Sequence, residues 1–364
     1  MTSMTGEERV VIGGVDTHRD THHVAVIDEV GRELADREFP ATRAGYRRLL
    51  GWLARQGRLA RVGVEGSGAY GAGLVRYLRS RGVVVVEVDR PDRRARRMSG
   101  KSDPLDAYAA ARAVLSGRAS GTPKAADGPV EAIRALRVAR SGAVKARTQA
   151  MNQLRGLLVN APAGLREQLQ GLGPRALVTA CARLRPEPVV SAADPALAAA
   201  KTALRALARR YQGLTAEIAE LDPQIRALVA AAAPTLLALP GVGPEVAGQL
   251  LVSAGDNPER LRSEAAFAHL CGTAPIPASS GRTDRHRLNR GGDRAANAAL
   301  YTVVLNRLRY DPHTRAYLAR RTAHGLTKKE IMRCLKRYLA RQTYHAIMTD
   351  RAIRTAANPV RAAA

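Results

Sequence analysis

The segment Lys101-Ser-Asp-Pro-Leu-Asp-Ala107 predicts the start of a helix, and the interpretation of the chain depends on it. A helix from Pro104 to about Gly117 suits this composition, because proline is favoured in the first turn and acids stabilise the positive end of the helix dipole. Asp103 and Asp106 are three positions apart, so both carboxylates share one helical face. Helix capping alone explains an isolated pair of this kind. Whether this pair of acids has a function beyond starting the helix therefore depends on the residues that precede it.

Those preceding residues predict an α/β domain. Hydrophobic runs and turn residues place strands at residues 10–16, 22–28, 31–39, 61–65 and 83–89, and helices at residues 42–56 and 66–80. Three sequential strands, followed by alternating helix and strand, are typical of the ribonuclease H-like fold, an α/β class with a mixed sheet.

Acidic residues recur at the ends of these predicted elements. Asp16 ends the first strand, Glu65 ends the fourth, and Asp103 and Asp106 begin the helix after the fifth. The first and fourth strands are neighbours in such a sheet, so the four carboxylates converge and repel one another unless cations neutralise them. We expect Mg²⁺, with Mn²⁺ as an alternative, because Mg²⁺ takes oxygen ligands and a pair of such ions can hold a phosphodiester.

The overall charge indicates a polyanionic partner. The chain has 364 residues and a formal net charge of +26, and basic side chains near phosphates release counterions. No apolar run approaches the roughly 18 residues of a membrane span, and no signal-peptide pattern opens the chain. The three cysteines, Cys181, Cys271 and Cys334, lack metal-ligand spacing. These features predict no membrane partner and a cytoplasmic, nucleoid-associated protein with reduced thiols.

The middle of the chain predicts two long helices. A linker at residues 121–129 precedes a helix over residues 130–160, and apolar residues at steps of three and four then run from Leu197 to Leu228. This heptad stripe indicates a coiled coil, although a helical hairpin within one chain explains it equally well. Pro223 lies inside the stripe and predicts a kink or break near Asp222.

Two motifs in the last region suit contact with phosphates. Residues 239–247 (LPGVGPEVA) resemble a helix-hairpin-helix, in which Gly241 and Gly243 expose backbone N–H groups, although a plain helix connection is the simpler explanation. Further along, Ser279-Ser280-Gly281 follows a proline-rich loop; such a tripeptide is ordinarily only a turn. Here it is followed by a basic cluster: Arg282, Arg285, His286, Arg287 and Arg290. Three more helices are predicted at residues 291–309, 312–324 and 327–349.

Three blocks of the sequence resemble the DEDD transposases of bacterial insertion sequences, which are related to the Piv-type DNA invertases. The blocks are Asp16-Thr-His-Arg-Asp-Thr-His22, Val64-Glu-Gly-Ser-Gly68 and Lys101–Ala107. The resemblance covers nearly the whole chain. It implies a RuvC-like domain at residues 8–121, a helical coiled-coil region at 122–233 and a mostly helical transposase domain at 234–350.

The resemblance also implies roles for individual residues. The acids Asp16, Glu65, Asp103 and Asp106 would be the metal-binding tetrad. Ser280, or failing that Ser279, would be a nucleophile that acts with the tetrad of another protomer in a dimer or tetramer. His286 is a candidate base and, more simply, a phosphate contact. The expected nucleic-acid contacts are Lys101, Gly241, Gly243, Arg282, Arg285, Arg287 and Arg290.

The sequence therefore predicts a DNA transposase or site-specific recombinase that acts on element ends and target DNA. Cleavage and rejoining would pass through a serine–phosphate bond, and the resemblance implies guidance by a structured RNA. Two other hypotheses stay open. One is a metal-only RuvC-like endonuclease that resembles Holliday-junction resolvases, with Ser280 as a spectator. The other is a DNA-binding protein without catalysis.

Overall fold

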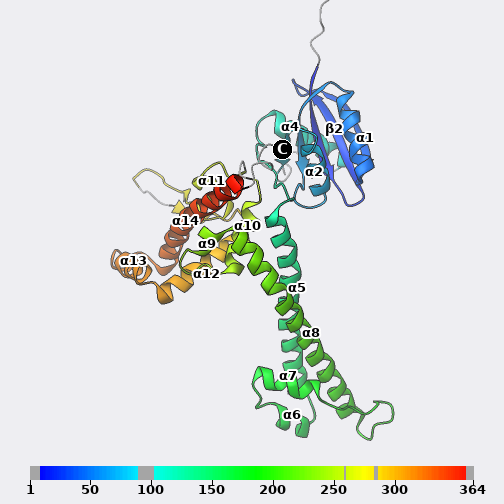
Figure 1. Cartoon of the computed structure of the whole chain (residues 1–364), viewed down its shortest axis with the longest axis vertical. Coiled ribbons are helices and arrows are strands. Elements are labelled where there is room, and N and C mark those ends of the chain that lie inside the picture. The colour runs from blue at the N-terminus through cyan, green and yellow to red at the C-terminus, as the bar shows by residue number, and fades with distance from the viewer. Residues whose placement is uncertain (1–8, 89–101, 258–259, 283–285, 358–364) are drawn as a thin grey trace, which may run out of the picture. The chain divides into compact units, whose positions relative to one another are not determined.

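The N-terminal part of the computed structural model is a five-stranded sheet with helices on both faces (Figure 1). The model describes residues 9–88, 102–257, 260–282 and 286–357. The strands are β1 (Val10–Thr17), β2 (Thr21–Asp28), β3 (Glu33–Pro40), β4 (Arg58–Glu65) and β5 (Val85–Val88), and the helices are α1 (Arg43–Ala54), α2 (Ala72–Arg79) and α4 (Asp103–Leu115). All five predicted strands are present, with shifts of a few residues at their ends.

The strand order is β3-β2-β1-β4-β5. β1, β2 and β3 form an antiparallel meander, whereas β4 pairs in parallel with both β1 and β5. The sheet is therefore mixed, as predicted, and compatible with the ribonuclease H-like class. Side chains alternate between its two faces: one hydrophobic cluster packs the sheet against α1 and α2, and a second packs it against α4.

Glycines let α4 lie unusually close to the sheet. A Cβ atom added at Gly14 in β1 would lie 2.1 Å from the carbonyl oxygen of Ala107 and 2.4 Å from the backbone nitrogen of Ala111. Gly63 in β4 is similarly close to Val114 and Ala110, at 2.7 and 2.9 Å. Glycine weakens a strand interior and often marks a close backbone approach. These two glycines therefore set the distance between α4 and the strands that carry Asp16 and Glu65.

The segment after β4 differs from the prediction, because α2 begins at Ala72 and not at residue 66. Gly66 has a positive φ of 67°, and the backbone N–H groups of Ala69 and Gly71 both donate to its carbonyl oxygen. A left-handed residue of this kind belongs to a turn and cannot continue a helix. Residues 66–71 therefore form a turn that leads away from Glu65.

The middle of the chain forms a helical hairpin with two short helices at its end. The helices are α5 (Pro129–Val159), α6 (Ala163–Leu169), α7 (Pro174–Ala182) and α8 (Pro195–Ala232). α5 and α8 run side by side and antiparallel (Figure 1), since Arg140 pairs with Asp222 and the guanidinium of Arg147 lies 5.8 Å from the ring centre of Tyr211. Of the two alternatives for the heptad stripe, the structure shows the hairpin within one chain.

Pro223 does not break α8, so of the predicted kink or break near Asp222 the break is wrong. The helix continues from Pro195 to Ala232, and Ile218 and Ile225 are buried on either side of the proline. One lost backbone hydrogen bond is a local cost. We attribute the continuity to packing of the apolar stripe along both halves of the helix, together with the ion pair of Asp222.

The last region is mostly helical, as predicted. Its elements are α9 (Pro234–Leu237), α10 (Pro244–Ala254), α11 (Glu264–Leu270), β6 (Ile276–Pro277), β7 (His286–Arg287), α12 (Arg294–Tyr310), α13 (Pro312–Ala323) and α14 (Lys328–Ala357). Asp293 caps α12 by accepting from the N–H groups of Ala295 and Ala296. The two-stranded pairing of β6 with β7 was not predicted, and α14 extends past the predicted end at residue 349.

The chain divides into two compact units, Met1–Glu131 with Leu250–Ala364, and Ala132–Gln249. The three-domain division at residues 121 and 233 stays a prediction. Cys181, Cys271 and Cys334 are free thiols. In the described ranges, no helix is both long enough and apolar enough to cross a bilayer.

Candidate metal centre

The strand register brings Asp16 and Glu65 to the same edge of the sheet. Val15 of β1 pairs with Val64 of β4 in the parallel ladder, so the two acids follow at the same level. Both valines face α1 and α2, and alternation directs the next residue of each strand towards α4. The Thr17 hydroxyl donates to the Glu65 carbonyl oxygen at 2.8 Å and ties the two strand ends together.

The first turn of α4 supplies the other two acids. Ser102 is the N-cap residue, and Asp103 is the first residue of the helix, so the alternative that Asp103 is itself the cap is wrong. The Asp106 N–H donates to the Ser102 carbonyl oxygen at 3.0 Å. The Asp106 side chain is buried against the sheet, whereas Asp103 is half exposed. Asp106 therefore lies on the inner side of the turn, with Asp103 nearer to solvent.

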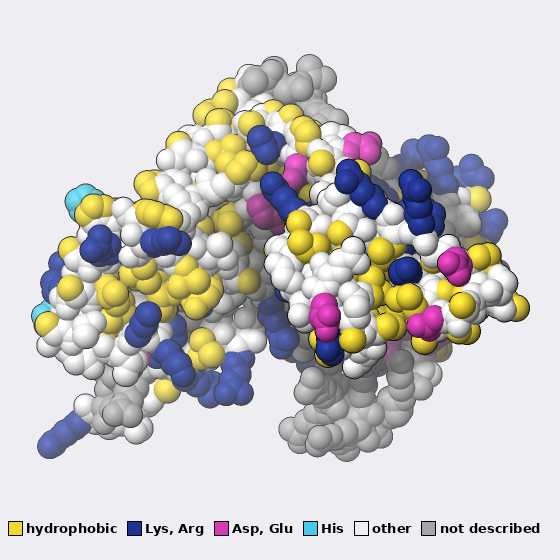
Figure 2. All heavy atoms as spheres, turned by 90° about the horizontal axis from the view of Figure 1, so that it is seen from below, with side chains coloured by type: hydrophobic (Ala, Val, Ile, Leu, Met, Phe, Trp, Pro, Cys, Tyr) yellow, Lys and Arg dark blue, Asp and Glu magenta, His cyan; other side chains and the backbone are white. Residues whose placement is uncertain are grey.

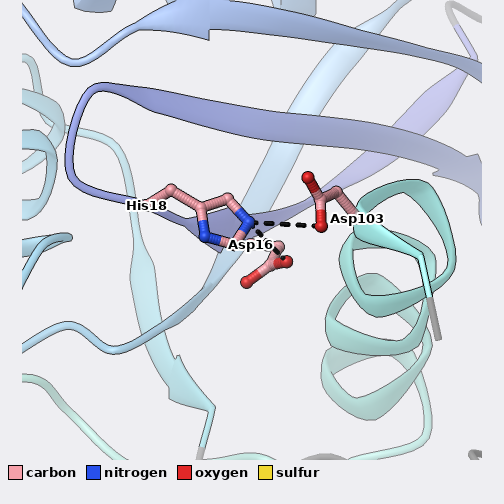
Figure 3. A group of neighbouring side chains, drawn as sticks. All are labelled: Asp16, His18 and Asp103. Atoms are coloured by element: carbon pink, nitrogen blue, oxygen red, sulfur yellow. Dashed lines mark ion pairs between the residues drawn. The ribbon is translucent and has the colours of Figure 1, made fainter.

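Asp16, His18 and Asp103 form a compact group at this edge (Figure 3). The His18 Nε2 atom lies 3.2 Å from Asp16 Oδ2 and 3.3 Å from Asp103 Oδ1. One donor atom from each residue lies within 4.8 Å of the other two. Nε2 is buried and makes no well-aligned hydrogen bond with either carboxylate. This atom therefore lies within ion-pair distance of both carboxylates.

The surroundings of Asp16 favour the protonated form of its carboxyl group. Burial is the largest effect and raises the pKa of Asp16, and the nearby charges of Asp106 and Asp103 raise this pKa further. His18 acts in the opposite direction and lowers it. Because desolvation and like charges both disfavour the ionised carboxylate, a bound cation would reverse the balance.

The side chains present fit a divalent cation. Asp16 and Asp103 offer carboxylate oxygens, the donors that Mg²⁺ and Mn²⁺ prefer, within a small volume that is open on the Asp103 side. Glu65 and Asp106 are not part of this three-residue group. Glu65 follows the same register as Asp16, and Asp106 is close enough to influence its pKa. The four predicted acids thus lie at one edge of the sheet, and His18 Nε2 lies between Asp16 and Asp103.

The other predicted site residues lie outside this group. Ser280 is exposed, and in the described part of the chain it makes no hydrogen bond with the four acids. The next residue, Gly281, has a positive φ of 55°, which explains why glycine follows the serine. The arginines at positions 282, 287 and 290 are exposed. Lys101 and Arg285 lie outside the described residues.

A turn connects α9 to α10 at the segment predicted to be a helix-hairpin-helix, and it fits a plain helix connection equally well. Gly241 has a positive φ of 77°, and the Val242 N–H donates to the Leu239 carbonyl oxygen at 3.1 Å. Nothing lies within 4 Å of a Cβ atom added at Gly243, directly before the first turn of α10. The backbone at the start of α10 is therefore open to a ligand.

His18 is the member of the group that sequence reasoning missed as a candidate ligand. The available signal was the Asp-x-His spacing at a strand end, because residues two apart share one face of a strand. The motif Asp16-Thr-His18 therefore carries the acid and the imidazole to the same side of the sheet.

Comparison with known proteins agrees with this geometry. Residues 13–161 match a family model of DEDD transposases of the IS110 type, described as a transposase, and residues 233–319 match the transposase family IS116/IS110/IS902. Together the two segments cover more than half of the chain. The first includes all four acids and the second includes Ser280.

Three individual relatives are proteins of bacterial insertion elements. The chain is 27% identical over 403 residues, covering 95% of itself and 96% of the relative, to a Streptomyces coelicolor mini-circle protein named as a candidate transposase for IS117. It is 36% identical over 121 residues to a 43.6 kDa protein of insertion element IS110 from the same organism, covering 32% of this chain and 29% of the relative. A 42 kDa protein of insertion element IS900 from Mycobacterium paratuberculosis is 29% identical over 141 residues, covering 38% of this chain and 35% of the relative. The chain therefore belongs to the DEDD transposases of insertion sequences and is a DNA recombination enzyme.

Proposed function

We propose that this transposase cleaves and rejoins the ends of an insertion element in a reaction that depends on Mg²⁺ and on Ser280. The observation that carries the proposal is the convergence of Asp16, Asp103 and His18 within 4.8 Å, with Glu65 and Asp106 at the same edge of the sheet. A RuvC-like reading of the fold is supported by the mixed strand order and by the acids at its strand ends.

In this proposal, Asp16, Glu65, Asp103 and Asp106 hold the divalent ions. When bound, Mg²⁺ would neutralise the acid cluster and stabilise negative charge on the phosphate oxygens. Mn²⁺ has the same preference for oxygen ligands and is expected to substitute for it. The half-exposed Asp103 marks the side from which a phosphodiester can reach the cluster.

Ser280 would supply the nucleophile. Its Oγ forms a bond to phosphorus as the bond from phosphorus to the departing strand oxygen breaks, and the hydroxyl proton passes to that oxygen. A hydroxyl at the end of a second strand then attacks the same phosphorus, which restores a phosphodiester and returns the proton to Ser280. The phosphate bond is conserved throughout, so rejoining needs no external energy source.

An exposed Ser280 without a hydrogen bond to the acids fits a composite site, in which this serine serves the acid cluster of another protomer. We expect a dimer or tetramer for that reason. The exposed arginines at positions 282, 287 and 290, and the open backbone at Gly241 and Gly243, would hold the phosphate backbone. On the face drawn in Figure 2, dark blue Lys and Arg side chains are widespread and magenta acids are few, which supports a nucleic-acid partner. A structured guide RNA is part of this proposal, because the chain resembles the family throughout its length.

The test uses purified protein, labelled DNA that contains the element ends, and any RNA that copurifies. Ser280→Ala should abolish a denaturation-resistant protein–DNA adduct, whereas Ser279→Ala should retain it. Asp16→Asn should abolish cleavage, whereas the exposed Asp20→Asn should not. Loss of activity after ribonuclease treatment, restored by the copurified RNA, would support guidance.

One alternative remains, in which the acids alone cut DNA as a metal-dependent endonuclease. The observation that favours it is the exposed position of Ser280, which makes no hydrogen bond with the acids in the described residues. Under this alternative, Ser280→Ala cleaves DNA at the wild-type rate and no protein–DNA adduct forms with either protein.

A further inference from the structure

A groove lined by arginines lies between the edge strand β3 and helix α1. Its volume is roughly 600 Å³. β3 contributes Arg37 and Phe39, and α1 contributes side chains along its solvent side. The lining residues are Arg37, Glu38, Phe39, Pro40, Arg47, Arg48, Gly51 and Arg55.

The guanidinium groups of this groove make no ion pair with the acids that the structure describes; Arg37 lies 5.9 Å from the ring centre of Phe39. In the described ranges, none of these four guanidinium groups has a carboxylate within ion-pair distance, although Glu38 is among the lining residues. Arg112 on α4, by contrast, pairs with Glu33 of the same strand β3. Like charges gathered in one groove repel one another, so an external anion with several negative groups would bind there favourably.

Gly51 is a second, independent sign of a ligand. It lies in the last turn of α1, and glycine is a weaker helix former than alanine. Nothing lies within 4 Å of a Cβ atom added there, so packing inside the protein does not require glycine. Arg48, Gly51 and Arg55 are spaced by three and four residues and share one helical face. The missing side chain therefore keeps the helix backbone open between two arginines about 10 Å apart along the axis.

The groove and the acid cluster lie on different faces of the sheet. Phe39 belongs to the hydrophobic cluster shared with α1, and Arg37, two residues earlier, shares that face. Asp16 faces α4 on the other side. We infer that this groove binds the sugar–phosphate backbone of a nucleic-acid segment other than the strand held at the acids. Phosphodiesters are common to DNA and RNA, so the test includes both.

The experiment measures binding of the full-length protein to a short labelled duplex of arbitrary sequence, made once as DNA and once as RNA, over a range of salt concentrations. Arg48→Gln with Arg55→Gln removes two charges from the groove. The control, Arg166→Gln with Arg175→Gln, removes two exposed charges from α6 and α7. For DNA, the logarithm of the binding constant falls linearly with the logarithm of the salt concentration, and this slope should be shallower by about 1.8 in the groove variant than in the wild type. Raising salt from about 50 to about 200 mM should then weaken wild-type binding about 12-fold more than binding of the groove variant.

A steric pair of variants tests the same groove without changing charge. Gly51→Gln should weaken binding, while Gly142→Gln on α5, where a Cβ atom also meets nothing within 4 Å, should not. The readout is binding and not cleavage, so a failure here is distinct from a failure of the proposed catalysis. The polymer that shows the effect, DNA or RNA, identifies the segment. Unchanged binding and salt slope for both groove variants on both polymers would overturn the inference.

Discussion

Replacing Gly14 by alanine should weaken Mg²⁺ binding at the metal centre, although none of the four acids is substituted. The added Cβ would lie 2.1 Å from the Ala107 carbonyl oxygen, and an ordinary contact begins at 3.4 Å, so α4 must retreat by about 1.3 Å. Metal sites tolerate about 0.2 Å in ligand distances. Because α4 carries Asp103 and Asp106, while Asp16 stays on β1, the shift should abolish tight Mg²⁺ binding.

The clash at Gly14 should also lower the stability of the protein and the rate of cleavage. Overpacking of this kind costs about 1–3 kcal/mol of unfolding free energy, and a displacement of about 1 Å can cost about 100-fold in rate. The assays are urea unfolding, a Mg²⁺ titration and cleavage of labelled element ends, all on the same preparation. We expect that Gly14→Ala folds, binds Mg²⁺ weakly and cleaves at least about 100-fold more slowly than the wild type.

Two neighbouring glycines provide graded controls. A Cβ atom at Gly13 points to the opposite face and meets only side-chain atoms of Leu53 and Val62, at 3.3–3.5 Å. A Cβ atom at Gly63 meets a side-chain atom of Val114 at 2.7 Å and the Ala110 carbonyl oxygen at 2.9 Å, so α4 must move less than in Gly14→Ala. Damage should therefore decrease in the order Gly14→Ala, Gly63→Ala, Gly13→Ala. If Gly14→Ala matched Gly13→Ala in Mg²⁺ affinity and cleavage, close packing of α4 would not position the acids.

Three further predictions concern single side chains. Asp16→Asn should stabilise the metal-free protein at neutral pH, because it removes a buried charge that faces other acids. Adding Mg²⁺ at 100 times its Kd should stabilise the wild type against unfolding by about 2.7 kcal/mol and should not stabilise the variant. Thermal unfolding with and without Mg²⁺ measures both effects. His22 is buried, stacked on Tyr46 with 5.7 Å between ring centres, and burial lowers its pKa below 6.5. His22 therefore takes up a proton more readily in the unfolded protein than in the folded protein. The free energy of unfolding should fall as pH drops below about 6.5, by up to about 1.4 kcal/mol per pH unit. His22→Phe should reduce this pH dependence, as measured by urea unfolding at several pH values. The Glu87 carboxylate accepts a hydrogen bond from Ser67 at 2.8 Å and pairs with Arg260 at 3.4 Å. Glu87→Ala should lower the free energy of unfolding, measured in urea, by about 1–3 kcal/mol, and Glu87→Gln should lower it less. Equal losses for the two variants would contradict a role for the charge.

Much of the sheet was predictable because its strands are short apolar runs between clear turn residues. The acids were predictable as a set, since strand ends and the first turn of α4 meet at one edge. His18 was missed because a lone histidine after a strand carries no strong signal; its role depends on α4 bringing Asp103 to within 3.3 Å. Pro223 misled because its local cost was weighed without the packing that continues through α8. The groove at Gly51 depends on β3 lying beside α1, which no local pattern reveals.

The glycines of β1 show what closer reading of the sequence could have added. Gly13-Gly14 interrupts an otherwise apolar strand, where glycine is unfavourable without a packing reason. The structure supplies that reason at Gly14, where α4 comes closest to the sheet. Two adjacent glycines two residues before a strand-end acid therefore indicate a helix pressed against that strand.

The central claim is that the acids at this edge of the sheet hold the catalytic cations. The most direct measurement is anomalous diffraction from crystals of the protein grown with Mn²⁺ and element-end DNA. The account predicts a Mn²⁺ peak at bonding distance from carboxylate oxygens of both Asp16 and Asp103, and its absence in Asp16→Asn crystals. A peak elsewhere, or clear density at this edge without any Mn²⁺ signal, would contradict it.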